Sequence, residues 1–246
     1  MTLVVITGAG GGLGRALAVD LTRRGCRVAG FGRSLDALLE TGRIAGDKFI
    51  PMQVDVADAV AVAAAFAALP APVTHLINNA AVYPRRNILD ETPASFAATM
   101  AINLGGVVAC TDAALQQMVL TGVGRIMNVS TFADISPLPA SSAYAVSKGA
   151  ARIYTRAIVA DLGDRFPGIV INDWMPGMLA TRMGIAHGLD PAVAARWGAE
   201  LLLLDDPGLT GTVWEMDREL LSPRSLKGRI KDRLLLRPRR QARRLG

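Results

Sequence analysis

The chain has 246 residues, of which 51% are hydrophobic and 20% are charged, a composition that predicts one compact domain with a large core. No apolar run approaches the length of a membrane span, and the strand-like segment at residues 3–6 leaves no room before it for a secretory signal. The two cysteines, Cys26 and Cys110, form neither a metal-binding spacing nor a disulfide framework, so we expect both to be buried in a cytoplasmic protein.

The net charge of +6 is unevenly distributed along the chain. Residues 222–246 contain ten Lys or Arg and one acid, Asp232, which gives this tail a charge of +9. The remaining 17 basic and 20 acidic residues leave the rest of the chain at −3. We therefore expect a mildly acidic domain over residues 1–221 and a basic tail over residues 222–246.

Short apolar segments alternate with helical patterns from the first residues onward. Strands are expected at residues 3–7, 27–31, 49–54, 75–77, 125–129, 169–174 and 212–216. Helices are expected from the glycine cluster to Arg24 and at residues 35–40, 58–69, 93–119, 142–165 and 192–204. This alternation indicates βαβ units, and so predicts an α/β fold with a doubly wound parallel sheet of about seven strands and helices on both faces.

A glycine-rich turn separates the first expected strand from the first helix. Residues 7–14 read T-G-x-x-x-G-x-G, one residue longer between the end glycines than G-x-G-x-x-G. Glycines let the backbone turn sharply and approach a pyrophosphate, whose charge the helix N-terminus favours. A glycine-rich turn can also exist without a ligand, but its place after a buried N-terminal strand favours dinucleotide binding.

A tyrosine and a lysine lie four residues apart in the long helix expected at 142–165. Tyr144 and Lys148 are thus on one helical face, one turn apart. A nearby ammonium favours the phenolate, so we expect the pKa of Tyr144 to be lowered toward neutrality. Such a tyrosine could give a proton to a carbonyl oxygen or take one from an alcohol. A tyrosine and a lysine at this spacing arise easily by chance. The motifs elsewhere in the chain therefore decide whether the pair is functional.

In that context the chain resembles the short-chain dehydrogenase/reductase family over roughly residues 2–217. The family motifs appear in order as the glycine turn, Asp55-Val56, N-N-A-A at residues 78–81, Ser130-Thr131, Tyr144/Lys148 and Pro176-Gly177. The resemblance implies a Rossmann-type fold and an oxidoreductase that moves a hydride between a nicotinamide and a carbonyl or secondary alcohol carbon. The nicotinamide supplies the difficult chemistry, so no metal is expected.

The resemblance also implies cofactor contacts along the chain. It places Asp55 and Val56 at the adenine, Asn79 and Ala80 beside the adenosine ribose, and Thr181 at the nicotinamide carboxamide. The further implied contacts are Gly8, Gly10, Gly11, Gly12, Leu13, Gly14, Tyr144, Lys148, Pro176, Gly177 and Leu179.

The end of the second strand bears on which nicotinamide cofactor is used. An acidic side chain there would bind a ribose with free hydroxyls, but this chain has Gly32, Arg33 and Ser34. A guanidinium and a hydroxyl suit a 2′-phosphate, which favours NADP, with NAD as second choice. The competing interpretation is that Arg33 is a solvated loop residue.

The resemblance assigns the remaining catalytic roles. A hydroxyl thirteen residues before the tyrosine holds the substrate oxygen, and that position is Thr131, with Ser130 as the alternative. Threonine keeps the donor and acceptor capacity of serine but is stiffer. Asn103 matches the asparagine that holds a water in the proton relay. Lys148 binds the nicotinamide ribose and keeps Tyr144 acidic.

Three departures from the family pattern affect the details. Ala81 replaces a glycine, which would be strained only if φ there were positive. The segment between Met183 and Ala192 is short, which suggests an open site and either a bulky small-molecule substrate or one carried on a larger molecule. The tail places Leu226, Ile230 and Leu234 at four-residue steps, a spacing that could form a basic amphipathic helix before Pro238.

Such a helix could contact an anionic membrane or an acidic partner, while a tail that packs on another subunit or stays disordered is the alternative. Nucleic acid is not expected to bind, because the body shows no basic patch with interleaved aromatics. The resemblance implies a homodimer or homotetramer. A cofactor-binding regulatory protein that has lost turnover is the main alternative function.

Overall fold

The structure is a computed structural model that describes residues 2–221 and 241–246. Its centre is one eight-stranded sheet in the order β3-β2-β1-β4-β5-β6-β7-β8. All neighbouring strands pair in parallel except β7 and β8, which pair antiparallel. The strands are β1 Leu3–Thr7, β2 Arg27–Gly32, β3 Phe49–Gln53, β4 His75–Asn78, β5 Val123–Val129, β6 Gly168–Met175, β7 Val213–Glu215 and β8 Arg218–Leu220. The predicted doubly wound α/β fold is therefore confirmed.

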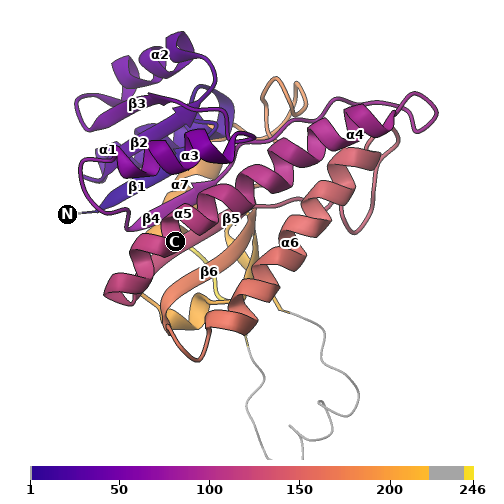
Figure 1. The fold of residues 1–246 in the computed structure, drawn as a ribbon. Helices are drawn as coiled ribbons and strands as arrows, with labels where there is room; N and C mark the ends of the chain where they lie inside the picture. The colour runs from indigo at the N-terminus through magenta and orange to yellow at the C-terminus, as the bar shows by residue number, and fades with distance from the viewer. Residues whose placement is uncertain (1, 222–240) are drawn as a thin grey trace, which may run out of the picture.

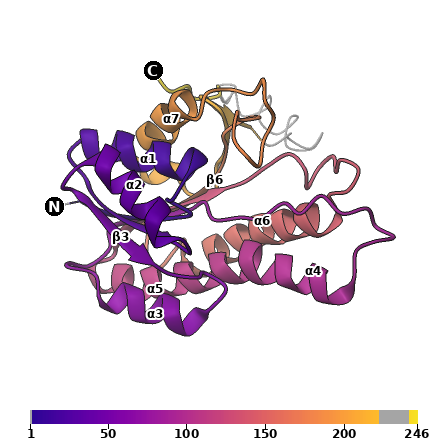
Figure 2. The same ribbon diagram turned by 90° about the horizontal axis from the view of Figure 1, so that it is seen from above.

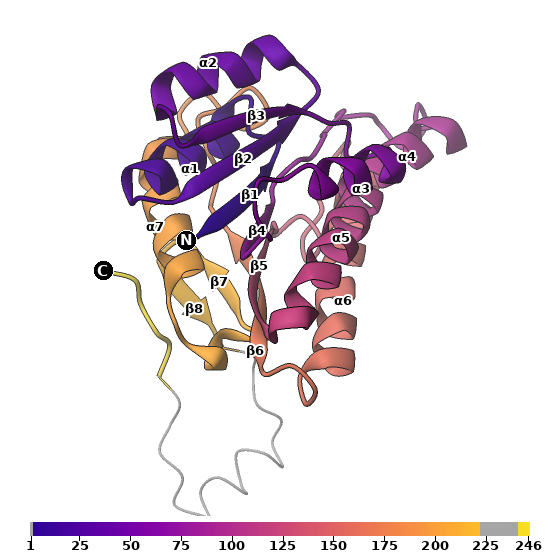
Figure 3. The same ribbon diagram turned by 60° about the vertical axis from the view of Figure 1, so that its left-hand side comes forward.

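Helices cover both faces of the sheet (Figures 1 and 3). One layer contains α1 Gly12–Arg23, α2 Leu35–Ala45 and α7 Pro191–Leu203; the other contains α3 Ala59–Ala67, α4 Pro93–Met100, α5 Gly106–Thr121 and α6 Ser142–Leu162. A π-helical turn, Ala101–Gly105, joins α4 to α5, and a 3₁₀ turn, Pro207–Leu209, follows α7. The far ends of α4 and α6 lie side by side and extend beyond the sheet (Figure 2).

The core is divided by the sheet into two apolar layers. Every residue of β1 is buried, as expected of a central parallel strand covered on both faces. Leu17 and Leu21 of α1 pack in the layer beneath α7, whereas Cys110 and Met118 of α5 pack in the opposite layer. Both cysteines are buried and free, as predicted, and burial raises the pKa of Cys110 to about 12.

Two sequence-based expectations about elements were incomplete. The final antiparallel strand β8 was missed, because three residues after a tight turn carry too short a pattern to be recognised. The single helix expected at residues 93–119 is instead two helices joined by the π-helical turn. That turn places Asn103 in the interior, where the side chain is fully buried.

The expectation that no segment is long and apolar enough to span a membrane also needs correction. The continuous helical stretch Pro93–Thr121 meets both criteria by length and composition alone, with 33% of the tested window buried. Its α5 portion packs against α3 and β4 and contributes Cys110, Ala114 and Met118 to the core. The stretch is therefore an integral layer of the α/β fold.

Residues 241–246 return to the domain and pack on its C-terminal edge. Arg244 forms an isolated antiparallel bridge with Arg218, and Leu245 is buried in the core. Arg243 pairs with Glu219 at 2.8 Å and with Asp206 at 2.6 Å. The boundary expected at residue 222 is thus not the end of the packed domain. The expected amphipathic helix around Leu226–Leu234, with its membrane contact, lies outside the described residues.

Candidate active site

The turn between β1 and α1 presents backbone amides at an open surface. Gly11 is the N-cap of α1, and none of the side chains that the structure describes caps this helix. A Cβ on Gly11 would meet no atom within 4 Å, whereas one on Gly14 would lie 2.2 Å from the carbonyl oxygen of Gly8. Gly8 and Gly12 have φ of +70° and +51°. Conformation or packing therefore requires glycine at three positions, while the space over Gly11 is free for a phosphate at the helix N-terminus.

The rest of this turn is held by its neighbours. Leu13 is buried beneath α7, and a Cβ on Gly10 would lie 3.1 Å from the Cβ of Ala37 on α2. The Arg15 guanidinium donates to the carbonyl oxygen of Gly10 at 2.7 Å and to the hydroxyl of Thr41 at 3.0 Å. The turn is thus fixed in shape before any ligand binds.

The residues expected around the adenosine lie on the loops after β2 and β3. Arg33 is exposed, and Ser34 caps α2 by accepting a hydrogen bond from the N–H of Ala37. Asp55 is exposed and accepts from the N–H of Ala57 at 3.0 Å, while Val56 is buried against α5. These loops follow neighbouring strands, so the four predicted residues share one edge of the sheet with the glycine turn.

The N-N-A-A segment is tied to the end of β1. The Thr7 hydroxyl accepts from the N–H groups of Asn79 and Ala80, each at 2.9 Å. The Asn79 amide donates to the carbonyl oxygen of Thr7 at 2.8 Å. Ala81, where the family has glycine, is not among the described non-glycine residues with positive φ, so its methyl group causes no backbone strain.

The loop after β6 closes on itself and touches the glycine turn. Residues Leu179 and Leu189 form a parallel bridge, and Gly177, after Pro176, has φ of +88°. A Cβ on Gly12 would lie 3.3 Å from the Thr181 methyl group. The structure therefore brings the predicted segment at residues 176–181 next to the predicted phosphate-binding turn.

The predicted hydroxyl and tyrosine lie together. The Thr131 side chain lies beside the Tyr144 phenol, where it favours a lower pKa of that phenol. The buried Ser130 hydroxyl instead accepts from the Arg152 guanidinium at 3.3 Å. The geometry thus places Thr131 beside Tyr144. Ser130 is bound instead to Arg152, which lies one helical turn beyond Lys148 on α6.

The expected lowering of the Tyr144 pKa by Lys148 is not found in the structure. Burial raises the pKa of Tyr144 above its ordinary value, and the neighbouring Thr131 side chain opposes this only in part. The Lys148 ammonium donates to the carbonyl oxygen of Val129 at 2.8 Å. Burial lowers the pKa of Lys148 to about 8, with Asp173 acting against the shift. The amine lies on the same helical face but is directed at the strand end.

Asn103 fastens two parts of the site together. Its carbonyl oxygen accepts from the N–H of Val82 at 2.8 Å, and its amide donates to the Val82 carbonyl oxygen at 2.9 Å. The second amide proton goes to the Ser147 hydroxyl at 3.0 Å. Both amide protons are therefore given to protein acceptors, and the loop after β4 is fixed to the helix that carries Tyr144.

Sequence reasoning missed the aromatic wall of the site. The Tyr83 ring stacks on the Tyr144 ring, with centroids 4.4 Å apart and planes at 17°. The Arg85 guanidinium lies 5.4 Å from the Tyr83 centroid and donates to the carbonyl oxygens of Met183 and Gly184 at 3.2 and 3.0 Å. No local pattern marks a loop tyrosine, so the sequence carried no signal for this contact.

A buried polar chain crosses the sheet below the site, and it was also missed. Asn78 donates to the Asn128 carbonyl oxygen, Asn128 donates to the Thr155 hydroxyl, and Thr155 donates to the Asp173 carboxylate, at 2.8, 2.9 and 2.9 Å. Asn78 also donates to the Thr111 hydroxyl at 3.0 Å. The sequence does contain a signal for this chain of hydrogen bonds, because Asn78, Asn128 and Asp173 are polar residues within otherwise apolar strands.

Comparison with known protein families shows to which family the chain belongs. The family of short chain dehydrogenases matches residues 2–191. The chain belongs to the short-chain dehydrogenase family. It is accordingly an NAD(P)-dependent oxidoreductase that acts on CH–OH groups.

Curated relatives of this short-chain dehydrogenase are 30–35% identical to it over the aligned residues. It is 35% identical over 191 residues to 2-(R)-hydroxypropyl-CoM dehydrogenase of Xanthobacter autotrophicus, and the aligned residues cover 74% of this chain and 76% of the relative. It is 30% identical over 198 residues to galactitol 2-dehydrogenase (L-tagatose-forming) of Cereibacter sphaeroides, covering 78% and 77%. It is 31% identical over 193 residues to carbonyl reductase [NADPH] 2 of Sus scrofa, covering 78% of each.

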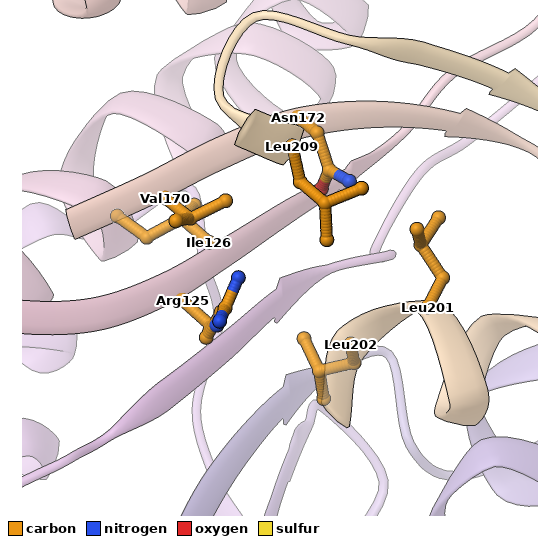
Figure 4. A pocket seen from close by; sticks show the side chains of 7 residues that line it. All are labelled: Arg125, Ile126, Val170, Asn172, Leu201, Leu202 and Leu209. Atoms are coloured by element: carbon orange, nitrogen blue, oxygen red, sulfur yellow. The ribbon is translucent and has the colours of Figure 1, made fainter. Parts of the chain in front are cut away.

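A solved structure supports the fold. Serine dehydrogenase from Escherichia coli superimposes with a TM-score of 0.78 at 23% identity, covering 91% of this chain and 100% of the other. A small cavity also lies in this short-chain dehydrogenase between β5, β6 and α7 (Figure 4). Its lining includes Arg125, Asn172 and Leu201 and shares no residue with the surroundings of Tyr144. It is separate from the candidate active site.

Proposed function

We propose that the chain interconverts a secondary alcohol and a carbonyl compound, with Tyr144 as the group that transfers the proton. The observation that carries this proposal is that Thr131 and Tyr144 lie side by side, on a loop and a helix that meet the glycine turn at one edge of the sheet. A nicotinamide cofactor held by that turn would supply or accept the hydride. The open space over Gly11 and the uncapped N-terminus of α1 fit its pyrophosphate.

The chain's own residues divide the remaining work. The Thr131 hydroxyl binds and polarises the substrate oxygen. In reduction the Tyr144 phenol gives its proton to that oxygen, and in oxidation the phenolate removes the alcohol proton. Lys148, whose pKa is near 8, can carry a positive charge at neutral pH beside the site. Asn103 holds the loop at Val82 in place.

We further propose a preference for NADP. Gly32 offers no acid to the adenosine ribose, and the exposed Arg33 and Ser34 follow it directly. A guanidinium pairs favourably with a 2′-phosphate, which an acid would repel. The name of one relative, carbonyl reductase [NADPH] 2, agrees with this choice.

The substrate we propose is a small molecule with a sizeable apolar part. Large apolar side chains are exposed on the three loops that follow β4, β5 and β6, the loops that surround Tyr144: Ile88, Leu89, Phe132, Ile135, Leu138, Met178, Met183 and Ile185. Ligand sites in parallel α/β sheets lie at the carboxyl ends of the strands, where these loops begin. An apolar rim of this kind favours substrates that bury hydrocarbon there.

We also propose a homodimer or homotetramer. Val146 and Ile153 lie seven residues apart on α6 and are 51% and 64% exposed, so they form one apolar helical face. Sedimentation velocity of the wild type and of a Val146→Glu, Ile153→Glu variant tests this. A wild-type monomer would contradict the proposal.

Tyr144→Phe tests the central assignment. Oxidation of NADPH and NADH is followed with ketones and aldehydes of increasing apolar size, for the wild type, Tyr144→Phe and the control Tyr154→Phe. We expect Tyr144→Phe to lose at least about a hundredfold in kcat, the usual contribution of general acid–base catalysis, while cofactor binding measured by fluorescence is kept. Full activity in Tyr144→Phe would refute the role. Cofactor binding without turnover of any substrate would favour the regulatory alternative.

A further inference from the structure

We propose that Asp134 and Arg152 form a positioning pair that fixes the Thr131 hydroxyl against Tyr144 and sets the charge around that phenol. The inference rests on the proposed roles of Thr131 and Tyr144. It adds two residues that hold neither substrate nor cofactor and act through their neighbours.

The pair is a buried ion pair. The Arg152 Nε lies 3.1 Å from the Asp134 carboxylate, and the two side chains are 7% and 10% exposed. Withdrawing two charges from water costs several kcal/mol per ion in general, so such a pair is weak evidence for a contribution to stability. A role in fixing the geometry of its surroundings accounts for its presence better.

Arg152 reaches the end of β5 with its other nitrogen. Nη2 donates to the Thr131 carbonyl oxygen at 2.8 Å, to the Ser130 hydroxyl at 3.3 Å and to the Met175 sulfur at 3.3 Å. A guanidinium is planar and holds its nitrogens in a fixed fork, so Nη2 can bond the carbonyl while Nε faces the carboxylate. Among the described residues Nε has no hydrogen-bond partner, so its contact with Asp134 is an ion pair. Arg152 therefore holds the Thr131 carbonyl and contacts the side chains of Ser130 and Asp134, which lie on either side of Thr131 in the chain.

This connection joins the loop that carries the hydroxyl to the helix that carries the phenol. Tyr144, Lys148 and Arg152 follow one another at four-residue steps on α6, so they share a helical face. Beyond Asp134 the loop is largely exposed, with Ile135 at 66% and Leu138 at 60%. The anchor at Asp134 is thus where this otherwise exposed loop is attached to α6.

The pair also affects the electrostatics of the site. The second carboxylate oxygen of Asp134 is buried and has no hydrogen-bond partner within the described part of the chain, and the negative charge of Asp134 raises the pKa of Tyr144. The other titratable group that acts on Tyr144 is Tyr83, on the loop after β4. Further along α6, Lys148 faces Asp173 of β6, and Arg152 and Arg156 face the same carboxylate. Loss of the Asp134 charge should therefore lower the pKa of Tyr144, and loss of the Arg152 charge should raise it.

Four variants test the proposal: Asp134→Asn, Arg152→Gln, Arg152→Lys and the double variant Asp134→Asn, Arg152→Gln. The control is Arg43→Gln, which removes a surface ion pair with Glu40 on α2. Phenol ionisation is followed by ultraviolet difference absorbance, with Tyr144→Phe versions of each variant subtracted. The chain has three tyrosines, so the Tyr144 signal can be isolated in this way.

We expect the Tyr144 pKa to fall in Asp134→Asn and to rise in Arg152→Gln, with the double variant between them. Arg152→Lys keeps the charge but loses the fork, so we expect it to titrate near the wild type while kcat falls about a hundredfold, the cost of a misplaced reacting group. Arg43→Gln should change neither measurement. Shifts in the same direction, or unchanged titration in both single variants, would overturn the proposal. If Arg152→Gln does not fold, Asp134→Asn and Arg152→Lys still decide it.

Phenol titration needs no substrate. A chain that shows the opposite shifts but turns over no carbonyl compound would uphold the pair and refute the proposed function. A chain that turns over a carbonyl compound without these shifts would uphold the proposed function and refute the role of the pair.

Discussion

The Tyr83 ring covers one face of the Tyr144 ring, with centroids 4.4 Å apart. Tyr83 belongs to the loop after β4, whereas Tyr144 lies in the first turns of α6. Asn103 fixes this loop through Val82, the residue before Tyr83, and Arg85 ties it to the loop after β6. The stack is thus held from both sides, and it shields the proposed proton-transfer group from water.

Replacing Tyr83 should therefore expose Tyr144. In Tyr83→Ala we expect the Tyr144 pKa to fall, because its burial is the main cause of the upward shift. Loss of an aromatic pair costs about 1 kcal/mol, so we expect kcat/KM to fall about fivefold or more. Steady-state kinetics over a pH series measure both effects. Tyr83→Phe keeps the stack and should behave as the wild type; an unchanged pH profile in Tyr83→Ala would contradict the shielding role.

The fold was predictable because its signals are local and repeated. A continuous apolar run such as residues 3–7 followed by glycines indicates a buried parallel strand, and the alternation with helices fixes the class. The strand β8 and the π-helical turn at Asn103 were not predictable, since each depends on tertiary contacts. The π-helical turn is stabilised because the Asn103 side-chain amide donates hydrogen bonds to Val82 and Ser147, which are distant in sequence.

Asp173 should make the stability of the domain depend on pH. Burial raises its pKa from 3.8 to about 7, so between about pH 4 and 7 the folded state binds a proton that the unfolded state has lost. The free energy of unfolding is then expected to fall as pH rises through this window and to level off above it. Urea denaturation at a series of pH values measures this dependence.

The matched variant is Asp173→Asn, which keeps an acceptor for the Thr155 hydroxyl. We expect it to lose the decline between about pH 4 and 7 and to be more stable than the wild type at pH 8. Asp161→Asn, on the exposed side of α6, should follow the wild-type curve. A curve for Asp173→Asn that is parallel to the wild type would show that another group is responsible.

Arg33 should determine the response to the 2′-phosphate. Arg33→Ala is expected to raise the KM for NADPH about tenfold, in line with the loss of one charge-assisted hydrogen bond, while the KM for NADH changes little. Arg43→Ala, an exposed arginine at the other end of α2, is the control. Equal losses with both cofactors would mean that Arg33 supports the fold of the loop and does not read the phosphate.

The chain order of the motifs predicted that Thr131 and Tyr144 share one site, and the two side chains do lie next to each other. What the sequence could not give is the direction of the side chains. Lys148 was expected to act on Tyr144, but its amine donates to Val129. Likewise, Asp134 and Arg152 are eighteen residues apart, and no spacing rule joins a loop acid to a helical arginine.

The C-terminal residues 241–246 should contribute to stability through Arg243. This guanidinium bonds the Glu219 carboxylate, whose side chain is 3% exposed, and also Asp206 and the Gly208 carbonyl oxygen. Removing one partner from a buried charge costs about 1–3 kcal/mol or more, so Arg243→Ala should lower the free energy of unfolding by about that amount. Arg244→Ala removes a pair whose arginine is 67% exposed and is expected to cost less than about 1 kcal/mol. Urea denaturation of both variants measures the difference. Equal losses would show that Glu219 does not depend on Arg243, because the exposed pair would then matter as much as the buried one.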